Sequence, residues 1–531
     1  MSQINANNLS FSYDSSYDPI FENVSFTIDT DWKLGFIGRN GRGKTTLLNL
    51  LLGRYSYSGS ITAPVSFDYF PFEVEDTAQN TIDVMKSSIA PYAEWEQEMQ
   101  RLLALQTEEA LLAYGDLLEH YIAADGYTID SLIEQELGKL GMNGEVLSRP
   151  FDTLSNGERT RVLLAALFLK HGNFLLIDEP TNHLDAQGRE AVANYLAAKK
   201  GFILVSHDRD LLDRVADHIL SINRTNIEVQ RGNYTSWQQN KDRQDAFELA
   251  ENDRLKKEVS KLTAAAKQKA GWSDRLESTK IGHRPPDQVP PDRGFIGHKS
   301  AKMMKRAKVI EQHAQRALEG KSALLKNLEH ADSLKLSPLP YRSTRQVQAV
   351  NLSIHYGDQP LFDHLNFTVE AGERVALCGG NGCGKSSILK LLLGDNIPST
   401  GQLLHSGDLI ISYVAQDTSF LQGDLKTFAQ HEQVDESLFK TILRKLDFSR
   451  VQFEKDMSEF SGGQKKKVLL AKSLCQQAHL YVWDEPLNFI DILSRVQIEQ
   501  LILEFSPTML FVEHDKRFVE NIATKKVVIG G

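Results

Sequence analysis

The sequence predicts an α/β protein made of two tandem copies of one domain, joined by a long helical hairpin. Three observations lead to this prediction. The first is an internal repeat of four motifs, in the same order and at matched distances. The second is that each half contains short apolar runs that end in Asp-Glu, as buried strands of a parallel sheet do. The third is a charged stretch of helix-forming residues between the two halves.

The internal repeat is the strongest signal in the chain. The first half contains GRNGRGKT, LSNGE, FLLIDEPTNHLD and SHD, and the second half contains GGNGCGKS, FSGGQ, LYVWDEPLNFID and EHD. The serine of the second motif precedes the first aspartate of the third by 23 residues in both halves, from Ser155 to Asp178 and from Ser461 to Asp484. That aspartate precedes the histidine of the fourth motif by 29 residues in one half and 30 in the other. These distances indicate a duplicated domain.

The composition divides the chain into domains at 1–237 and 341–531, with a linker at 238–340. Both ends of the linker are rich in charged helix formers. Between them lie two Pro-Pro pairs and several glycines, which no helix can run through. We therefore expect two long antiparallel helices with a tip loop at about 282–298.

The first domain is longer than the second between the first and third motifs. Lys44 and Asp178 are 134 residues apart, whereas Lys385 and Asp484 are 99 residues apart. Much of the extra chain is a Glu-, Leu- and Ala-rich stretch with apolar residues at helical spacing. It predicts an inserted helical hairpin at about 90–128, and the alternative is a longer helical subdomain.

Composition excludes several classes of protein. The 531 residues are 41% hydrophobic and 24% charged, which is ordinary for a globular protein. No apolar run approaches the roughly 18–20 residues of a spanning helix, and the N-terminus lacks the pattern of a secretory signal. Three cysteines are too few for a disulfide framework or a four-ligand zinc site. We therefore expect a protein of the reducing cytoplasm.

The net charge of −10 hides a strong asymmetry. Residues 241–345 carry a local net charge of +9, and the rest of the chain carries −19. A basic middle between two acidic halves favours contact of that one segment with a polyanion.

The first motif of each half has the GxxxxGK[ST] pattern of a phosphate-binding loop. Its glycines let backbone N–H groups approach phosphates, and the loop opens a helix whose positive end faces the anion. Each copy follows a strand-like run, and its lysine is expected to contact the β- and γ-phosphates of ATP. The residues assigned to this task are Gly38, Asn40, Gly41, Gly43, Lys44, Thr45 and Thr46 in the first half, and Gly379, Asn381, Gly382, Gly384, Lys385, Ser386 and Ser387 in the second.

The third motif of each half supplies a carboxylate for Mg²⁺. Asp178 and Asp484 end apolar strands, where a carboxylate can hold the ion beside the phosphates. The hydroxyl groups of Thr45 and Ser386 are expected to be further ligands.

Catalysis is assigned to the residues that follow. Glu179 and Glu485 come directly after those aspartates and are placed to orient the attacking water. His207 and His514 follow further apolar strands. A lone histidine is more often structural, but the matched distances favour contact with the γ-phosphate.

The motifs resemble those of the ATP-binding-cassette (ABC) family. LSNGE and FSGGQ look like its signature loop, which in that family contacts the ATP held by the opposite cassette. The resemblance implies two composite sites. Site 1 combines Lys44, Glu179 and His207 with Ser461, Gly462 and Gly463, and site 2 combines Lys385, Glu485 and His514 with Ser155 and Gly157.

The same resemblance implies roles for single residues. Tyr13 and Tyr356 match the aromatic residue that stacks on adenine, although packing within a strand is the alternative. Gln416 matches the glutamine that senses Mg²⁺ and the γ-phosphate. Asp185 and Asp491 match the loop that couples the two sites.

Three positions depart from the family pattern. Phe72 stands where the first cassette should carry the Mg²⁺-sensing glutamine. Asn156 replaces a signature glycine, and asparagine tolerates unusual backbone angles better than most residues. Leu487 replaces the threonine after Asp-Glu-Pro. We therefore expect the two sites to differ, with slower hydrolysis at one of them.

Fused cassettes with no membrane span and a charged helical linker resemble the ABC-F branch over essentially the whole chain. That resemblance implies a monomer whose own cassettes pair, and a bacterial ribosome as partner, through 23S rRNA and P-site tRNA, rather than DNA or a membrane. Five linker cations without an acid among them suit RNA phosphates, although a solvated helix face is the alternative. They are Lys299, Lys302, Lys305, Arg306 and Lys308.

Within ABC-F, four segments resemble the antibiotic-resistance branch of Lsa and Vga type. They are residues 31–48, 247–252, 303–308 and 483–491. That branch protects the ribosome against lincosamides, streptogramin A compounds and pleuromutilins. The resemblance implies that the tip residues Val289, Phe295 and Ile296 approach the drug site, although they could instead join the two helices. It also makes the insertion an arm that reaches toward the stalk of the large subunit.

The predicted mechanism is a switch driven by ATP. Two ATP molecules close the cassettes, the closed form binds the ribosome and pushes on P-site tRNA, and the tip displaces the drug. Hydrolysis at Glu179 and Glu485 then releases the protein. The alternatives are a housekeeping translation factor of the same branch, the ATPase subunit of a transporter, a DNA-repair or chromosome ATPase, and an ATP sensor without turnover.

Overall fold

The computed structural model describes residues 2–13, 19–182, 184–223, 226–278, 298–299, 301–302, 304–306, 308–310, 312, 334–356 and 359–530. These residues belong to two compact units. The first unit, which holds both cassettes, consists of Met1–Ile222, Asn226–Tyr234 and Ala331–Gly531. The second unit consists of Asn223–Thr225 and Thr235–His330.

The first cassette is built on a six-stranded sheet with the order β5-β6-β7-β3-β8-β9. Its neighbouring strands are parallel except β9, which runs antiparallel to β8. The strands are β3 (Lys33–Gly38), β5 (Ser66–Phe70), β6 (Asn173–Asp178), β7 (Phe202–Val205), β8 (His218–Ile222) and β9 (Ile227–Arg231). A separate antiparallel sheet has the order β2-β1-β4, formed by β1 (Gln3–Phe11), β2 (Phe21–Asp29) and β4 (Ser58–Thr62).

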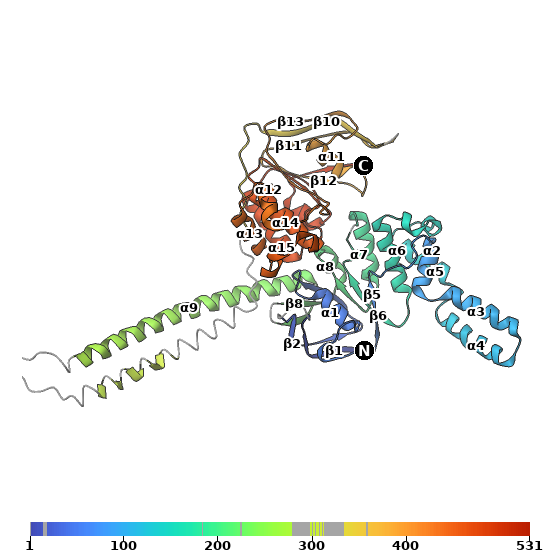
Figure 1. The fold of residues 1–531 in the computed structure, drawn as a ribbon, viewed down its shortest axis with the longest axis horizontal. Coiled ribbons are helices and arrows are strands. Elements are labelled where there is room, and N and C mark those ends of the chain that lie inside the picture. Colours follow the sequence, from blue (N-terminus) through green and yellow to red (C-terminus); the bar gives the residue numbers. More distant parts are fainter. Residues whose placement is uncertain are drawn as a thin grey trace, which may run out of the picture. The chain divides into compact units, whose positions relative to one another are not determined.

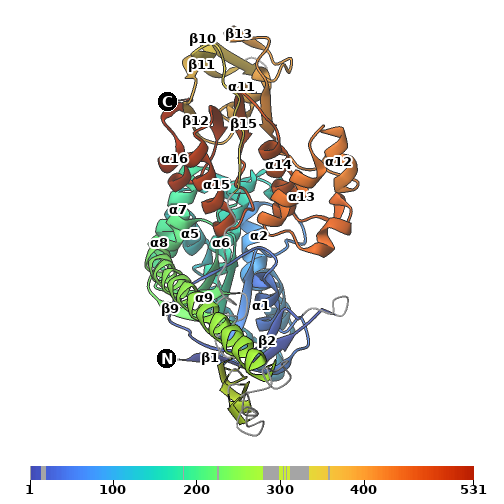
Figure 2. The ribbon, with the colours of Figure 1, turned by 90° about the vertical axis from the view of Figure 1, so that its left-hand side faces the viewer.

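The second cassette repeats this plan. Its parallel sheet has the order β14-β15-β16-β12-β17, formed by β12 (Arg374–Cys378), β14 (Ile411–Val414), β15 (Leu480–Asp484), β16 (Met509–Val512) and β17 (Lys525–Val528). Its antiparallel sheet has the order β11-β10-β13, formed by β10 (Arg345–Tyr356), β11 (Gln359–Glu370) and β13 (Ser399–His405). In Figures 1 and 2 this second sheet forms the outer layer above α11. The predicted α/β class with two repeated domains is confirmed.

Helices pack around the sheets of both cassettes. In the first cassette they are α1 (Lys44–Leu51), α2 (Thr81–Ile89), α5 (Ile129–Lys139), α6 (Asn156–Leu169), α7 (Ala186–Ala198) and α8 (Arg209–Val215), with short 3-10 turns η1 (Gly144–Ser148) and η2 (Phe151–Thr153). In the second cassette they are α11 (Lys385–Leu392), α12 (Leu425–His431), α13 (Glu436–Lys445), α14 (Gly462–Cys475), α15 (Ile492–Phe505) and α16 (Lys516–Ile522), with 3-10 turns η3 (Arg450–Glu454) and η4 (Met457–Glu459).

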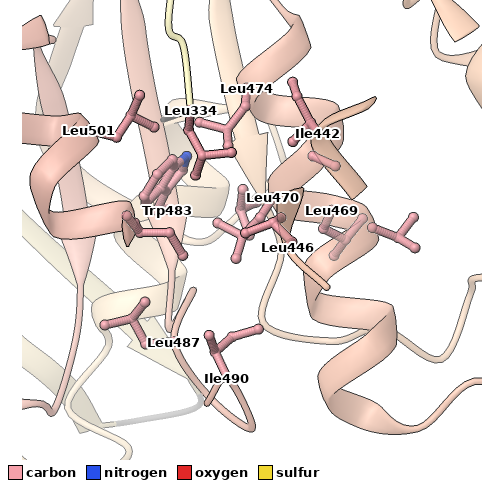
Figure 3. Close-up of a cluster of buried hydrophobic side chains, with 14 of the residues drawn as sticks. Leu334, Ile442, Leu446, Leu469, Leu470, Leu474, Trp483, Leu487, Ile490 and Leu501 are labelled. Atoms are coloured by element: carbon pink, nitrogen blue, oxygen red, sulfur yellow. The ribbon is translucent and has the colours of Figure 1, made fainter. Parts of the chain in front are cut away.

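The core of the second cassette explains one departure from the family pattern. All five residues of β15 are buried, because helices cover this part of the sheet, and the strand therefore reads as an unbroken apolar run before its aspartate. Figure 3 shows Trp483 of that strand in one cluster with Leu487 and Ile490, together with Leu470 of α14. Leu487 is 1% exposed, so an apolar side chain suits its place in this core.

The extra residues of the first cassette include two helices, α3 (Tyr92–Leu105) and α4 (Glu108–Ala123), which lie side by side (Figure 1). Their bases are joined where the Tyr92 hydroxyl donates to the Ala124 carbonyl oxygen at 2.6 Å. The apolar stripe seen in the sequence is only partly used for packing. Leu102 is buried, whereas Leu111 and Leu112 are 53% and 69% exposed.

The second unit contains α9 (Tyr234–Ser278) from Thr235 onward. This is a single helix of 45 residues and therefore about 68 Å long. Beyond it, short helical pieces carry Lys302, Lys305, Arg306 and Lys308, all of them exposed. The predicted tip loop, with Val289, Phe295 and Ile296, lies outside the described residues. Among the helices in the described part of the chain, none is both long and apolar enough to cross a membrane.

Candidate nucleotide-binding sites

The parallel sheets bring the repeated motifs to one edge. In the first cassette Val205 of β7 lies opposite both Phe36 of β3 and Asp178 of β6, so the three strands end together. In the second cassette Val512 of β16 lies opposite Leu377 of β12 and Asp484 of β15. Ligands of open α/β sheets bind beyond the carboxyl ends of such strands.

Each phosphate loop begins where β3 or β12 ends, and it needs its glycines. Gly41 and Gly43 have φ angles of 81° and 94°, and Gly382 and Gly384 have φ angles of 77° and 97°, all in the left-handed region that favours glycine. At Gly43 a Cβ atom would also lie 2.5 Å from Ile20. At the N-termini of α1 and α11 the two loops therefore have a left-handed backbone conformation that most other residues would strain.

The two loop lysines are buried and point into their own loops. Lys44 Nζ donates to the carbonyl oxygens of Gly38 at 2.7 Å and Arg39 at 3.2 Å. Lys385 Nζ makes the matching bonds to Gly379 at 3.0 Å and Gly380 at 2.6 Å. Burial lowers the pKa of Lys44. Asn40 Oδ1 is a further partner of Lys44 at 3.5 Å, and Cys383 Sγ is a further partner of Lys385 at 3.9 Å. A buried cation with no carboxylate among these hydrogen-bond partners is well placed to pair with a phosphate.

The strand-end aspartates can hold a divalent cation. Asp178 Oδ2 accepts hydrogen bonds from the hydroxyls of Thr45 at 3.2 Å and Tyr69 at 3.1 Å. Asp484 is 1% exposed, and within the described residues neither of its carboxylate oxygens has a hydrogen-bond partner. Burial raises the pKa of Asp484 to about 6. A buried carboxylate without a partner is costly unless a cation binds it, so this donor set fits Mg²⁺.

The glutamates after these aspartates adopt a rare backbone conformation. Glu179 and Glu485 have φ angles of 50° and 47°, and such angles in non-glycine residues are typical of functional sites. The His207 and His514 Nε2 atoms lie 3.5 Å and 3.6 Å from the glutamate Oε1 atoms of their own cassettes. The structure thus brings each predicted glutamate and histidine pair together.

The two glutamates differ in their electrostatics. Burial, with the charge of Asp178 added, raises the pKa of Glu179 to about 8. Burial also acts on Glu485, but His514 and the Asn488 amide outweigh it and bring the pKa of Glu485 below its usual value. Burial further lowers the pKa of His207. The two sites are therefore not equivalent in the structure.

Two cavities contain residues from both cassettes. The site 1 cavity, of about 610 Å³, is lined by Tyr13, Ile20, Asn40, Gly41, Gly43, Lys44, Thr45, Thr46, Tyr69, Pro71, Asp178, Glu179, Asn182, Val205 and His207 of the first cassette and by Ser461, Gly462, Gly463 and Phe489 of the second. The site 2 cavity, of about 580 Å³, is lined by Leu361, Asn381, Gly382, Gly384, Lys385, Ser386, Ser387, Gln416, Glu485, Asn488 and His514 of the second cassette and by Ser155, Asn156, Gly157, Leu184 and Arg189 of the first. Both are large enough for a small-molecule ligand.

A hydrogen bond between the cassettes lies at each cavity. In site 1 the Asn40 side-chain amide donates to the Phe489 carbonyl oxygen at 2.8 Å. In site 2 the Asn381 backbone N–H donates to Asp185 Oδ2 at 3.4 Å. The counterpart of Asp185 behaves differently, because Asp491 is fully buried and pairs with Lys467 at 2.9 Å.

The departures noted in the sequence have structural explanations. Phe72 does not line site 1, and its ring lies instead 5.1 Å from Lys170 Nζ. Tyr69, which the sequence did not single out, reaches Asp178 in site 1. Asn156 begins α6 directly after Ser155, without a positive φ angle, so tolerance of unusual angles is not needed there.

The two tyrosines predicted to stack on adenine differ in what the structure describes. The Tyr13 hydroxyl shares a hydrogen bond of 2.8 Å with the Thr46 hydroxyl. The side chain of Tyr356 lies outside the described part.

Lys466 of α14 does not line the site 2 cavity but holds residues of that site in place, and sequence reasoning missed it. It is 2% exposed, and its Nζ donates to the carbonyl oxygens of Ala415 at 2.6 Å, Gln416 at 3.2 Å and Asp484 at 3.2 Å. It therefore fixes the segment that carries Gln416 against the end of β15. Thr160, at the same motif position in the first cassette, bonds only within its own helix, to the Asn156 carbonyl oxygen.

Replacing Lys466 with methionine is expected to destabilise the second cassette by about 1–3 kcal/mol, because buried carbonyl oxygens lose their donor. Urea unfolding measures the change. Replacing the neighbouring Lys465 with methionine is the matched control and should change stability by less than about 0.5 kcal/mol. Equal effects of the two changes would contradict the role of Lys466.

A family model described as "ABC transporter" matches residues 21–182 and 362–488. The chain is 28% identical over 520 residues to the probable ATP-binding protein YbiT of Escherichia coli O157:H7, covering 96% of this chain and 92% of the relative. It is 26% identical to the energy-dependent translational throttle protein EttA of Haemophilus influenzae, covering 95% and 88%. It is also 26% identical to the ribosome protection protein VmlR of Bacillus subtilis, covering 98% and 85%.

Solved structures share the fold. One is the complex of the archaeal ribosomal stalk protein aP1 with the archaeal ribosome recycling factor aABCE1, with a TM-score of 0.59 at 16% identity over 99% of this chain and 87% of that one. Another is the RNase-L inhibitor, with a TM-score of 0.58 at 16% identity over 99% and 88%. The tandem arrangement of two cassettes is thus found in known structures.

Proposed function

We propose a ribosomal function for this chain, which belongs to the ABC transporter family. The ATP-binding domains of this family use ATP with Mg²⁺, so the chain is an ATPase. Its homologues include ABC-F ATPases. In our proposal the chain acts in the cytoplasm, binds the bacterial ribosome when ATP is bound, and protects the peptidyl-transferase centre from lincosamides, streptogramin A compounds and pleuromutilins.

One observation carries the proposal. The ribosome protection protein VmlR aligns with 98% of this chain, so the similarity extends over the linker as well as both cassettes. A relative that shared only the two ATPase domains would align with the cassettes and not with the linker. The linker would be inserted near P-site tRNA and displace the drug, as the resemblance to the antibiotic-resistance branch implies.

The residues of the two cavities have the chemistry that the proposal needs. Lys44 and Lys385 would bind phosphates, and Mg²⁺ would be held by Thr45 and Asp178 in site 1 and by Ser386, Asp484 and Gln416 in site 2. The ion neutralises charge on the phosphates. Glu179 and Glu485 would orient water, and the signature serines and glycines of the opposite cassette would complete each site.

The exposed cations after the linker tip are proposed to meet RNA phosphates. Lys302, Lys305 and Lys308 are exposed in the described pieces of this segment. Replacing all three with serine is expected to weaken ribosome binding and to lower the slope of log affinity against log salt by about 2–3, because each lost phosphate contact removes about 0.7–0.9. Co-sedimentation with ribosomes at a series of salt concentrations measures this slope.

A matched triple variant controls that experiment. Lys390, Lys426 and Lys455 are exposed lysines of the second cassette. Their replacement with serine removes the same charge from another surface and should leave the slope unchanged. ATPase activity should be unchanged in both variants. If the linker variant keeps the wild-type slope, these lysines do not bind RNA.

A housekeeping translation factor is the second candidate. The translational throttle protein EttA matches this chain at the same 26% identity, over 95% of its length. Expression in a drug-sensitive bacterium separates the two functions. A rise in the inhibitory concentration of a lincosamide or pleuromutilin supports protection, whereas ribosome binding without such a rise supports the translation factor. Sedimentation with membranes rather than ribosomes would contradict both.

A further inference from the structure

A buried ion pair joins the two cassettes beside site 1. Arg209 follows the histidine of site 1 by two residues, and its guanidinium pairs with Glu499 of α15 in the other cassette. The two side chains are 6% and 8% exposed. Asp515 lies 3.8 Å from the same guanidinium, and the Asn521 amide donates to Glu499. Removing one partner from such a buried pair leaves an uncompensated charge, so the contact is costly to break.

A second ion pair reinforces the first. Arg517 of α16 pairs with Asp213 of α8, and the guanidinium lies 6.0 Å from the centre of the Tyr234 ring, where α9 begins. Helices α8 and α16 contact each other where the cassettes meet. We call Arg209, Asp213, Glu499 and Arg517 the hinge cluster. Each of its pairs takes one residue from each cassette.

The interface between the cassettes has one edge beside site 1, where the hinge cluster lies, and one edge beside site 2. The internal repeat shows that the site 2 edge lacks both ion pairs. Counting from the matched aspartates and histidines, the counterparts of Glu499 and Arg209 are Ala193 and Lys516. An alanine cannot pair with the lysine. The counterparts of Arg517 and Asp213 are Asp210 and Glu520, two acids, which cannot form an ion pair with each other. The two ion pairs of the hinge cluster therefore have no counterparts beside site 2.

A cavity occupies the place of the missing pair. It has a volume of about 340 Å³ and is lined by Ala193, Asp210 and Lys516, together with His514 of site 2. Ala193 is buried, whereas Lys516 is exposed. The two cassettes are therefore less tightly packed beside site 2 than beside site 1, where charged side chains fill the same position.

We propose that the hinge cluster keeps the cassettes joined beside site 1 throughout the ATPase cycle, and that they separate at the edge beside site 2. Nucleotide in site 2 then exchanges through this opening, while nucleotide in site 1 stays enclosed for longer. Arg209 and Glu499 act as positioning residues, since they line neither nucleotide cavity but set which edge moves. The inference needs the ATPase activity and does not depend on the ribosomal function.

The sharpest test installs the missing pair. Ala193→Glu places a carboxylate in the cavity that Lys516 also lines, and the cavity has room for the longer side chain. Spin labels introduced as unnatural amino acids at the exposed residues Glu190 and Lys526 report the site 2 edge, and labels at Arg231 and Gln500 report the site 1 edge. Pulsed dipolar spectroscopy on the full chain, with Mg·ATP and after its removal, measures both distances.

In the wild type the Glu190–Lys526 distance is expected to lengthen when Mg·ATP is removed, while the Arg231–Gln500 distance stays constant. Ala193→Glu should abolish the lengthening and lower steady-state turnover at least about tenfold, because the new pair resists opening. Ala193→Gln, a neutral side chain of the same size, should behave as the wild type. Adding Lys516→Glu to Ala193→Glu should restore opening and turnover.

Two outcomes overturn the proposal. One is a wild type in which the site 1 edge lengthens as much as the site 2 edge, or in which the site 2 edge does not lengthen. The other is an Ala193→Glu protein that opens as freely as the Ala193→Gln control. Failure of ribosome binding leaves these measurements unaffected, so the two proposals fail separately.

Discussion

Replacing Glu179 and Glu485 together with glutamine is expected to lower ATP turnover by about 10²–10⁴-fold while ATP binding is kept, because glutamine has the shape of glutamate but cannot take up a proton. Both residues line their cavities and directly follow the strand-end aspartates Asp178 and Asp484. Steady-state phosphate release measures turnover, and a fluorescent nucleotide measures binding. The ATP-bound variant should also stay on ribosomes when they are pelleted.

The single Glu→Gln variants measure how much each site contributes to ATP turnover. Because the electrostatics of Glu179 and Glu485 differ, each alone should lower turnover by a different factor. Glu504→Gln, at an exposed position of α15, is the control and should leave turnover unchanged. A double variant that turns over ATP within a few-fold of the wild type would remove both glutamates from catalysis.

Replacing Gly463 with alanine is expected to disrupt site 1. A Cβ atom there would lie 2.5 Å from the Phe489 carbonyl oxygen and 3.0 Å from the Asn40 side-chain nitrogen, the two atoms that join the cassettes. Overpacking of this kind costs about 1–3 kcal/mol, so ATP affinity or turnover should fall by about 5- to 150-fold. Titration of nucleotide binding and steady-state turnover measure the change.

The neighbouring glycine provides the matched control. A Cβ atom at Gly462 would meet only the Phe489 ring, at 3.3 Å, and the first cassette already carries Asn156 at the same motif position. Gly462→Ala should therefore have a much smaller effect. If both variants behave as the wild type, the signature loop does not contribute to site 1.

Much of the fold followed from the sequence because the signals were local. Apolar runs that end in Asp-Glu predicted buried parallel strands, and β6 and β15 are such strands. The spacing of the repeat predicted two domains of one type. The starts of the signature helices are also a local feature of the sequence, because the side chains of Ser155 and Ser461 cap α6 and α14.

The nucleotide-site residues were chosen from the repeat, and the structure brings most of those in the described part into the two cavities. Gly38, Gly379 and Asp484 do not line them. Their roles in ATP binding and catalysis stay predictions. Tyr69 was missed because its partner Asp178 lies 109 residues away in the chain. Lys466 was missed because its partners Asp484 and Gln416 lie 18 and 50 residues away, and no local pattern marks such contacts. Phe72 stands where the Mg²⁺-sensing glutamine was expected, and its ring lies near Lys170 rather than in site 1. The loss of a Mg²⁺ contact at that position stays a prediction.

By itself the sequence determined the repeated α/β cassettes and the chemistry of each motif, because glycine, lysine and carboxylate positions act within a few residues of one another. Only the tertiary structure decided which residues of the two copies meet across the interface. Arg209 meets Glu499 from 290 residues away, while their counterparts Lys516 and Ala193 line a cavity. Pairs of this kind depend on which surfaces face each other, and that is fixed by packing rather than by any motif.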